Sequence, residues 1–250
     1  MRPTIRLLAA VALGLPAISQ AGPSDYVIMP NVEYGEREID FKYGTAKLSG
    51  GEGRESAGSI GLGWGATPWW FTEAYLKYEK VPGEKTRYDA FEWENKFQLT
   101  ETGKYFVDVG FITEIEVPRE RRVEGYELAL GPLLQWETGA LQWNANVLFE
   151  RIFRGETDPD QPRVTEMGYQ FQVKYRARPE FEYGIQAFGN MGDWKHWEST
   201  SKQEHVAGPA LFGKIKTGPR EAIKWNAAWL VGLSKAAADN TLRIQAEYEF

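Results

Sequence analysis

The stretch Leu141-Gln142-Trp143-Asn144-Ala145-Asn146-Val147-Leu148-Phe149-Glu150 places an apolar residue at every odd position and a polar residue at nearly every even one. Side chains of a β-strand alternate between its two faces, whereas a helix repeats about every 3.6 residues. The stretch therefore predicts a strand with one apolar and one polar face. The same alternation recurs at 105–117 and 169–176, and it extends along the chain from residue 34 onward.

Extending this pattern predicts twelve strands of about 10 to 13 residues, longer than the roughly 5 or 6 residues common in soluble proteins. A tilted strand needs about 9 to 11 residues to cross a membrane, so the lengths favour a membrane barrel. The predicted strands cover 34–46, 56–66, 69–80, 87–99, 105–117, 123–136, 140–152, 165–176, 181–192, 205–216, 222–233 and 241–250.

The connections between these strands fall into two alternating classes. The short class covers 67–68, 100–104, 137–139, 177–180 and 217–221. The longer, more polar class covers 47–55, 81–86, 118–122, 153–164, 193–204 and 234–240. Bacterial outer-membrane barrels have short periplasmic turns, longer external loops and an even strand count. We therefore predict an all-β, antiparallel, up-and-down transmembrane barrel with both termini in the periplasm.

Aromatic residues gather beside the short connections, where a membrane barrel carries the girdle that lies at the level of the lipid head groups. The residues expected in this girdle are Trp69, Trp70, Phe97, Tyr105, Trp136, Trp143, Tyr175, Phe181, Trp225 and Tyr248.

The N-terminus has the order of a secretory signal: Arg2 and Arg6, an apolar stretch over 7–15, and small residues up to Ala21. We expect cleavage after Ala21, which leaves 22–33 as a periplasmic lead-in and 34–250 as the barrel domain. The apolar stretch is shorter than the roughly 20 residues of a membrane helix, and no later stretch is longer.

Charge and composition exclude some classes of function. The formal net charge of −6 becomes about −8 without residues 1–21, which disfavours nucleic acid as a partner. The chain has no cysteine, so neither disulfides nor thiolate chemistry is available. A mean hydropathy of −0.47 is compatible with a barrel, because lipid-facing residues alternate with polar ones.

The last strand alternates up to its final residue, from Leu242 through Tyr248 to Phe250. This ending resembles the C-terminal signal of Gram-negative outer-membrane barrels, which the barrel-assembly machinery recognises. The resemblance implies assembly in the outer membrane, with Tyr248 and Phe250 as the recognised residues. The chain after residue 21 also resembles uncharacterised proteobacterial barrels described only as transporters or membrane proteins, which implies no mechanism.

The polar faces carry opposite charge in the two halves of the barrel. In the first seven strands the inward residues are mostly acidic: Glu38, Asp40, Glu73, Glu79, Glu92, Glu94, Asp108, Glu114, Glu116, Glu127 and Glu150, against Lys42, Lys77 and Lys96. In the last five strands they are Lys174, Arg176, Lys214, Lys216, Lys224 and Arg243, against Glu166, Glu182, Glu247 and Glu249. Closure of the barrel would place an acidic wall opposite a basic one.

We expect these walls to line a channel for passive diffusion of small polar or cationic solutes, because wall charge is how pores choose among ions. Six inward glycines leave space for such a channel: Gly61, Gly63, Gly110, Gly131, Gly168 and Gly184. The alternative is a plugged structural or interaction barrel without conductance, in which the charges pair across a filled interior. In either case the expected partners of the protein are outer-membrane lipid, lipopolysaccharide and the assembly machinery. A channel would also have a small solute as its partner.

An enzyme embedded in the membrane is the remaining alternative. A lipid-modifying barrel needs a nucleophile within hydrogen-bond reach of a base, and the only histidines are His196 and His205, with Ser199 and Ser201 nearby in sequence. We expect no catalysis, because an external loop with this composition is more often a solvated or head-group contact.

Two further loops carry charge runs. Glu156, Asp158 and Asp160 lack the glycine turn and the distal glutamate of a calcium loop, so we expect no metal site there. Arg119, Arg121 and Arg122 could contact lipid phosphates, although an exposed charge run is the default reading. No motif predicts a cofactor.

Overall fold

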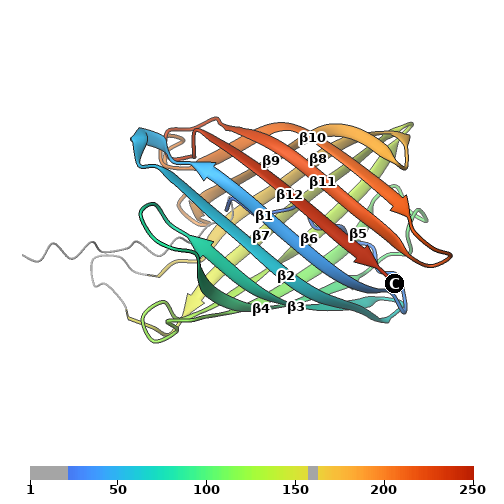
Figure 1. Ribbon diagram of the computed structural model, residues 1–250, viewed down its shortest axis with the longest axis horizontal. Helices are drawn as coiled ribbons and strands as arrows, with labels where there is room; N and C mark the ends of the chain where they lie inside the picture. The colour runs from blue at the N-terminus through green and yellow to red at the C-terminus, as the bar shows by residue number, and fades with distance from the viewer. Residues whose placement is uncertain (1–21, 157–162) are drawn as a thin grey trace, which may run out of the picture.

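The computed structural model describes residues 22–156 and 163–250. Within these ranges twelve strands form a closed antiparallel barrel, in which consecutive strands pair and β1 pairs with β12 (Figure 1). The strands are β1 (Arg37–Lys47), β2 (Arg54–Thr67), β3 (Trp70–Lys80), β4 (Arg87–Gln98), β5 (Asp108–Pro118), β6 (Tyr126–Thr138), β7 (Leu141–Phe153), β8 (Glu166–Arg178), β9 (Phe181–Asp193), β10 (Glu204–Lys216), β11 (Ala222–Gly232) and β12 (Asn240–Glu249). The described ranges also hold a 3-10 turn, Ser49–Gly51, and no helix long and apolar enough to cross a membrane.

The predicted fold class and strand number are confirmed. The largest differences lie at the starts of β1, β5 and β6, which were expected at 34, 105 and 123. β5 begins late because its preceding turn is held by side chains: the Gly103 N–H donates to Asp108 Oδ1 at 2.7 Å, and the Val109 N–H donates to Thr100 Oγ1 at 2.8 Å. The connection 99–107 is therefore longer than the 100–104 that the sequence predicts.

The first and last strands close the barrel. Ile39 of β1 lies opposite Tyr248 of β12, and Tyr43 lies opposite Ile244. The Phe250 N–H continues this ladder by donating to the carbonyl oxygen of Arg37 at 2.9 Å. Closure matters because it leaves no strand edge with unpaired backbone groups, which a membrane does not tolerate.

Alternation along each strand places polar side chains inside and apolar ones outside. In β1, Asp40 is 1% exposed whereas its neighbour Phe41 is 48% exposed. A soluble protein has the opposite arrangement, with charged residues at its surface. An apolar outer surface around a polar interior is the arrangement of a barrel that spans a membrane.

The two ends of the barrel differ in their connections. The short-turn end carries 68–69, 99–107, 139–140, 179–180 and 217–221, together with the start of β1 and the end of β12. The long-loop end carries 48–53, 81–86, 119–125, 194–203 and 233–239, together with 154–156 and 163–165. The expected signal peptide at 1–21 lies outside the described residues, as do Asp158 and Asp160 of the acidic loop.

Candidate functional site

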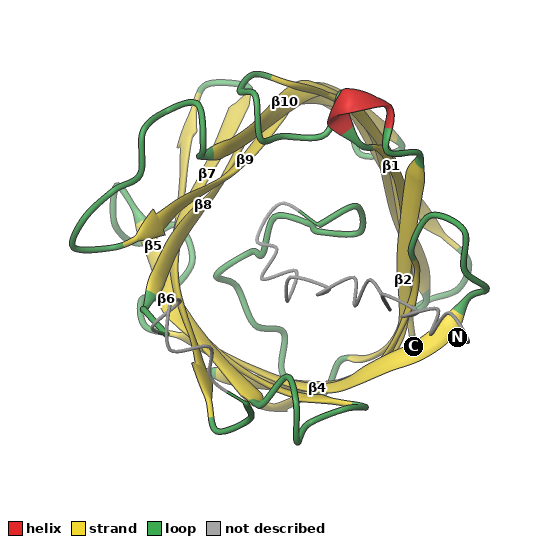
Figure 2. Cartoon of the chain, turned by 90° about the vertical axis from the view of Figure 1, so that its left-hand side faces the viewer, coloured by secondary structure: helices red, strands yellow, loops and turns green. Residues whose placement is uncertain are grey.

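Residues 22–33, expected to be a periplasmic lead-in, lie within the lumen; we call them the lumenal segment. A view along the barrel shows a loop inside the ring of strands (Figure 2). Val27, Ile28 and Pro30 are buried, and the segment contacts wall residues of β4, β7 and β8. The lumen is therefore partly filled by the chain itself.

Wall glycines show how the lumenal segment runs. A Cβ on Gly44, in the long-loop half of β1, would overlap the carbonyl oxygen of Pro23. A Cβ on Gly65, near the short-turn end of β2, would overlap the carbonyl oxygen of Glu33. The lumenal segment thus runs from the long-loop side to the short-turn end, and its backbone packs directly on the wall.

Wall amides satisfy the backbone of the lumenal segment. The Ile28 N–H donates to Gln170 Oε1 at 3.1 Å, and the Ile28 carbonyl oxygen accepts from Asn146 Nδ2 at 2.9 Å. The Val32 N–H donates to Gln98 Oε1 at 2.7 Å. Since buried backbone groups need partners, these contacts specify where the lumenal segment lies.

Two apolar patches on the inner wall receive the lumenal segment. Val27 packs into one that comprises Phe188, Val206, Ala210, Phe212, Ala228, Leu230 and Ala237. Ile28 packs into another that comprises Ile112, Leu133 and Leu148, with Tyr26 against it. Apolar residues at inward positions of a barrel are unusual, and they were the sequence signal that could have revealed a segment inside the lumen.

Tyr26 lies at a cluster of charges in the middle of the lumenal segment. Its hydroxyl donates to Glu94 Oε2 at 2.6 Å. The Lys42 ammonium lies 3.5 Å from the centre of the Tyr26 ring and 3.6 Å from that of Tyr75, and 3.4 Å from Asp40 Oδ2. Cation–π contacts and a carboxylate together stabilise the buried lysine.

The lumenal segment leaves two cavities in the barrel. The large cavity, of about 730 Å³, extends toward the short-turn end. The small cavity, of about 100 Å³, lies on the long-loop side. Tyr26 and Ile28 line both cavities, so the lumenal segment separates them.

The cavities collect most of the residues that the sequence proposes for the lumen. Six of them line the large cavity: Glu73, Glu94, Lys174, Arg176, Lys214 and Lys224. Five line the small cavity: Glu92, Glu114, Glu116, Glu127 and Glu150. Asp108 and Arg243 are buried but line neither cavity. Asp108 holds the 99–107 turn, and Arg243 Nη2 donates to Gln186 Oε1.

Many basic residues of the lumen are paired with nearby carboxylates. Lys77 contacts Glu92 at 2.9 Å and also contacts Glu116. Around the large cavity, ion pairs join Lys174 to Glu182, Arg176 to Glu137 and Glu182, Lys214 to Glu249, and Lys224 to Glu36, Glu247 and Glu249. The basic wall is therefore largely neutralised from within, which the sequence could not show.

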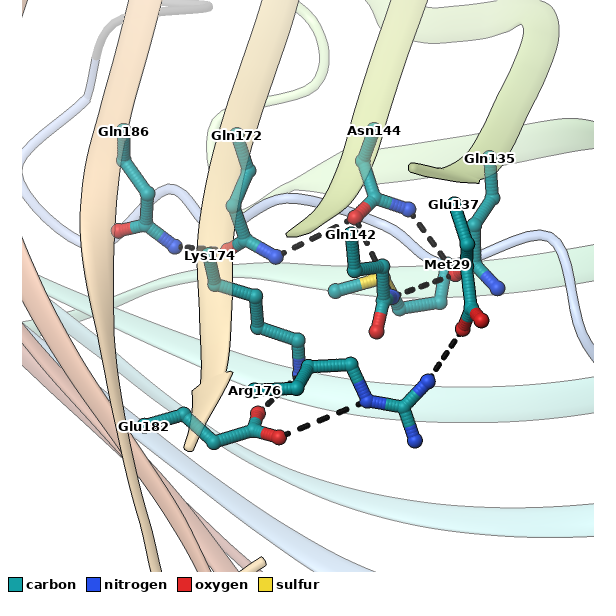
Figure 3. Close-up of polar contacts among 10 residues, drawn as sticks. All are labelled: Met29, Gln135, Glu137, Gln142, Asn144, Gln172, Lys174, Arg176, Glu182 and Gln186. Atoms are coloured by element: carbon teal, nitrogen blue, oxygen red, sulfur yellow. Dashed lines mark hydrogen bonds and ion pairs between the residues drawn. The ribbon is translucent and has the colours of Figure 1, made fainter. Parts of the chain in front are cut away.

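A row of buried amides crosses β6 to β9 on one side of the lumen (Figure 3). Asn144 Nδ2 donates to Gln135 Oε1 at 3.1 Å, Gln172 Nε2 to Asn144 Oδ1 at 3.3 Å, and Gln186 Nε2 to Gln172 Oε1 at 2.6 Å. Below this row, Lys174 and Arg176 converge on Glu182 (Figure 3). This wall presents uncharged donors and acceptors rather than net charge.

The hydrogen bonds of the histidine rings go to groups other than Ser199 and Ser201. His205 Nδ1 lies 3.1 Å from the Tyr169 hydroxyl oxygen, and His205 Nε2 lies 2.8 Å from Gln203 Oε1, both within hydrogen-bond distance. His196 Nδ1 lies 3.3 Å from Asp193, whereas Ser199 and Ser201 contact each other. Both ring nitrogens of His205 are thus engaged by groups other than a serine hydroxyl.

One carboxylate cluster has the spacing of a metal site. Oxygens of Glu36, Glu247 and Glu249 lie within 4.8 Å of one another, but Lys224 Nζ contacts all three residues. The lysine ammonium supplies the positive charge that a metal would bring. Glu156 and the arginines at 119, 121 and 122 are exposed.

Most aromatic residues expected in the girdle lie partly or fully exposed near the short-turn end. Trp69, Tyr105 and Phe181 are exposed, and Tyr248 stacks on Phe250 with ring centres 5.7 Å apart. Trp225 differs, because it lines the large cavity.

No protein-family model matches the sequence, and no curated protein matches it. Among solved structures, the NanC porin has a TM-score of 0.57 at 11% identity, over 86% of this chain and 98% of that one. The COG4313 outer membrane channel from Pseudomonas putida F1 has a TM-score of 0.59 at 10% identity, over 90% and 99%. The translocator domain of autotransporter NalP from Neisseria meningitidis has a TM-score of 0.52 at 11% identity, over 87% and 89%.

The chain therefore has the fold of an outer-membrane β-barrel. At these identities the likeness shows the fold alone. Two of the three similar structures are named as a porin and a channel, and the third as a translocator domain.

Proposed function

We propose that this protein is an outer-membrane channel for small polar and cationic solutes, narrowed by its own lumenal segment. The likeness to a porin and an outer-membrane channel supports transport as the class of function. The proposed preference for cations rests on the charged residues that line the lumen of this chain.

The observation that carries the proposal is the excess of carboxylates on both sides of the lumenal segment. The large cavity is lined by nine acidic residues and five basic ones. The small cavity is lined by six acidic residues and two basic ones. Fixed negative charge in a narrow aqueous path concentrates cations and excludes anions, so a solute meets the same preference in both cavities.

The lumenal segment sets the constriction. Because Tyr26 and Ile28 line both cavities, a solute that crosses the barrel passes them. The hydrogen bond from Tyr26 to Glu94 and the burial of Ile28 hold the constriction in place. Passage therefore requires the lumenal segment to shift.

The proposal includes the setting of the barrel. Residues 1–21 would be removed as a signal peptide, the short-turn end would face the periplasm, and Tyr248 and Phe250 would be recognised during assembly. Lipid and lipopolysaccharide would then surround the outer wall and the long-loop end.

The second candidate is a plugged structural barrel without conductance. The close packing of Gly44 and Gly65 on the lumenal segment favours it. The two candidates differ in whether ions pass through the wild-type barrel and through the Tyr26→Ala variant.

The test is single-channel recording in planar bilayers, on the wild type and on Tyr26→Ala. The channel proposal expects conductance steps that become larger in Tyr26→Ala, since the variant loses the ring between the cavities. Silence in both proteins would support the plugged barrel.

Selectivity is tested with Glu114→Gln and Glu127→Gln combined, which leaves the partners of Lys77 intact. In a KCl gradient the reversal potential should move toward zero relative to the wild type. Glu84→Gln with Glu120→Gln removes the same charge from exposed loop positions and should leave the potential unchanged.

A further inference from the structure

One wall of the large cavity gathers buried carboxylates from three strands. Asp40 of β1, Glu73 of β3 and Glu94 of β4 all line it, and Glu73 is only 4% exposed. Neighbouring groups already engage part of this cluster: Tyr26 donates to Glu94, and Lys42, Tyr75 and Gln245 contact Asp40 Oδ2.

Two carboxylate oxygens of this cluster lack a partner among the described residues. Asp40 Oδ1 and Glu73 Oε1 are both buried and accept no hydrogen bond there. A buried carboxylate oxygen is costly unless a donor or a cation reaches it. Both residues line the large cavity, so a cationic group entering the cavity can meet this need.

The opposite wall offers a different chemistry. Gln135, Gln172 and Gln186 of the amide row line the same cavity, and their side chains carry both donors and acceptors. The bases nearby, Lys174 and Arg176, are held by Glu182 and Glu137, so they do not present free positive charge. This wall suits hydroxyl or amide groups of a solute.

The size of the large cavity fits a small organic molecule. Its volume of about 730 Å³ lies within the roughly 300 to 1,000 Å³ typical of ligand sites. A bare metal ion would leave most of this space and the amide wall unused.

We propose that the large cavity is a binding site for a small organic cation with a primary ammonium group and further polar groups. The ammonium group binds Asp40 and Glu73, and the polar remainder contacts the amide row. The inference deepens the proposed function, since it names the solute class that the channel would carry, but binding itself requires no conductance.

The test is isothermal titration of the purified barrel in detergent at 0.1 M NaCl with three probes of similar length. These are 1,4-diaminobutane, the neutral 1,4-butanediol and the anion succinate. Binding of the diamine, with no measurable binding of the diol or of succinate, is the expected result. Equal binding of the diamine and the diol would overturn the proposal, as would the absence of diamine binding.

Variants locate the site. Asp40→Asn and Glu73→Gln should each weaken diamine binding about tenfold or more, because each removes a charge-assisted hydrogen bond. Glu101→Gln removes one charge from an exposed turn and should bind as the wild type does. If Asp40→Asn, Glu73→Gln and Glu101→Gln all bind the diamine with equal affinity, the general negative field of the barrel attracts it and not a specific site. That result would overturn the assignment.

Two further readings keep the outcome clear. In gel electrophoresis, a folded variant migrates faster unboiled than boiled, which shows which variants are folded. The comparison of the three probes uses the wild type and does not depend on any variant. The diamine is also displaced with NaCl and, separately, with tetramethylammonium chloride. If salt acts only by screening, the two salts should displace the diamine equally at equal ionic strength. Displacement by NaCl at far lower concentration would assign the site to an inorganic cation and overturn the proposal.

Discussion

Gly44 of β1 and Pro23 of the lumenal segment lie so close that no side chain fits between them, since a Cβ on Gly44 would overlap the Pro23 carbonyl oxygen. The groups on both sides of this contact belong to the backbone, so neither can move aside as a flexible side chain could. The contact therefore links the position of the lumenal segment directly to one residue of the wall.

Gly44→Val should displace the lumenal segment from the wall. Single-channel conductance should rise relative to the wild type, because the obstruction between the cavities moves. Ala74→Val, on the outward face of β3, adds side-chain volume without reaching the lumen and serves as the control. Unchanged conductance in a folded Gly44→Val barrel would show that the segment does not limit the current.

The two faces of one strand should differ in how much the same charge destabilises the barrel. Ile60, in the middle of β2, is exposed on the outer face, whereas Ser59 is buried and lines the acidic small cavity. Ile60→Lys should lower the free energy of unfolding by about 2 to 4 kcal/mol near the bilayer midplane. Ser59→Lys should cost much less, which reversible urea unfolding from lipid vesicles can measure for both variants.

Salt should weaken the cation preference. The Debye length falls from about 10 Å at 0.1 M to about 3 Å at 1 M, so the wall carboxylates act over a shorter range at high salt. The ratio of cation to anion permeability should therefore decrease as KCl rises across this range at a fixed gradient. A ratio that stays constant would indicate selection by size alone.

Removal of the amide contacts should loosen the lumenal segment. Asn146→Leu with Gln170→Leu leaves the N–H and carbonyl groups of Ile28 without their partners, at a cost of about 1 to 3 kcal/mol for two hydrogen bonds. Because the chain has no cysteine, Ser24→Cys provides a single labelling site. Its reaction with a thiol reagent should accelerate roughly tenfold in the double variant; Asn226→Leu, away from Ile28, gives the comparison.

The alternation of apolar and polar residues was sufficient to predict twelve strands, because the inward and outward faces differ at almost every position. Phe41 and Asp40 illustrate this, as adjacent residues with opposite exposure. The inward direction of Glu73 and Glu94 follows from the same parity. Boundaries were less accurate where side chains such as Asp108 hold a turn.

The lumenal segment could not be predicted, because residues 22–33 have no periodicity and most of their contacts are with residues far along the chain. Tyr26 meets Glu94, and Ile28 meets Gln170. The ion pairs inside the lumen could not be predicted either. Strand parity shows that a side chain such as Lys224 points inward, but it does not show which carboxylates the side chain reaches. The inward apolar residues Ile112 and Leu148 were the one visible sign.

Only residues 34–36 join the lumenal segment to β1, and the Gly35 N–H anchors them by donating to the Gly65 carbonyl oxygen at 2.8 Å. A released segment of twelve residues can extend at most about 40 Å from this anchor. Its return is therefore intramolecular, with a rate independent of protein concentration and an effective concentration of about a millimolar or more. A free peptide with the sequence of 22–33 would need to be supplied at comparable concentration to take its place.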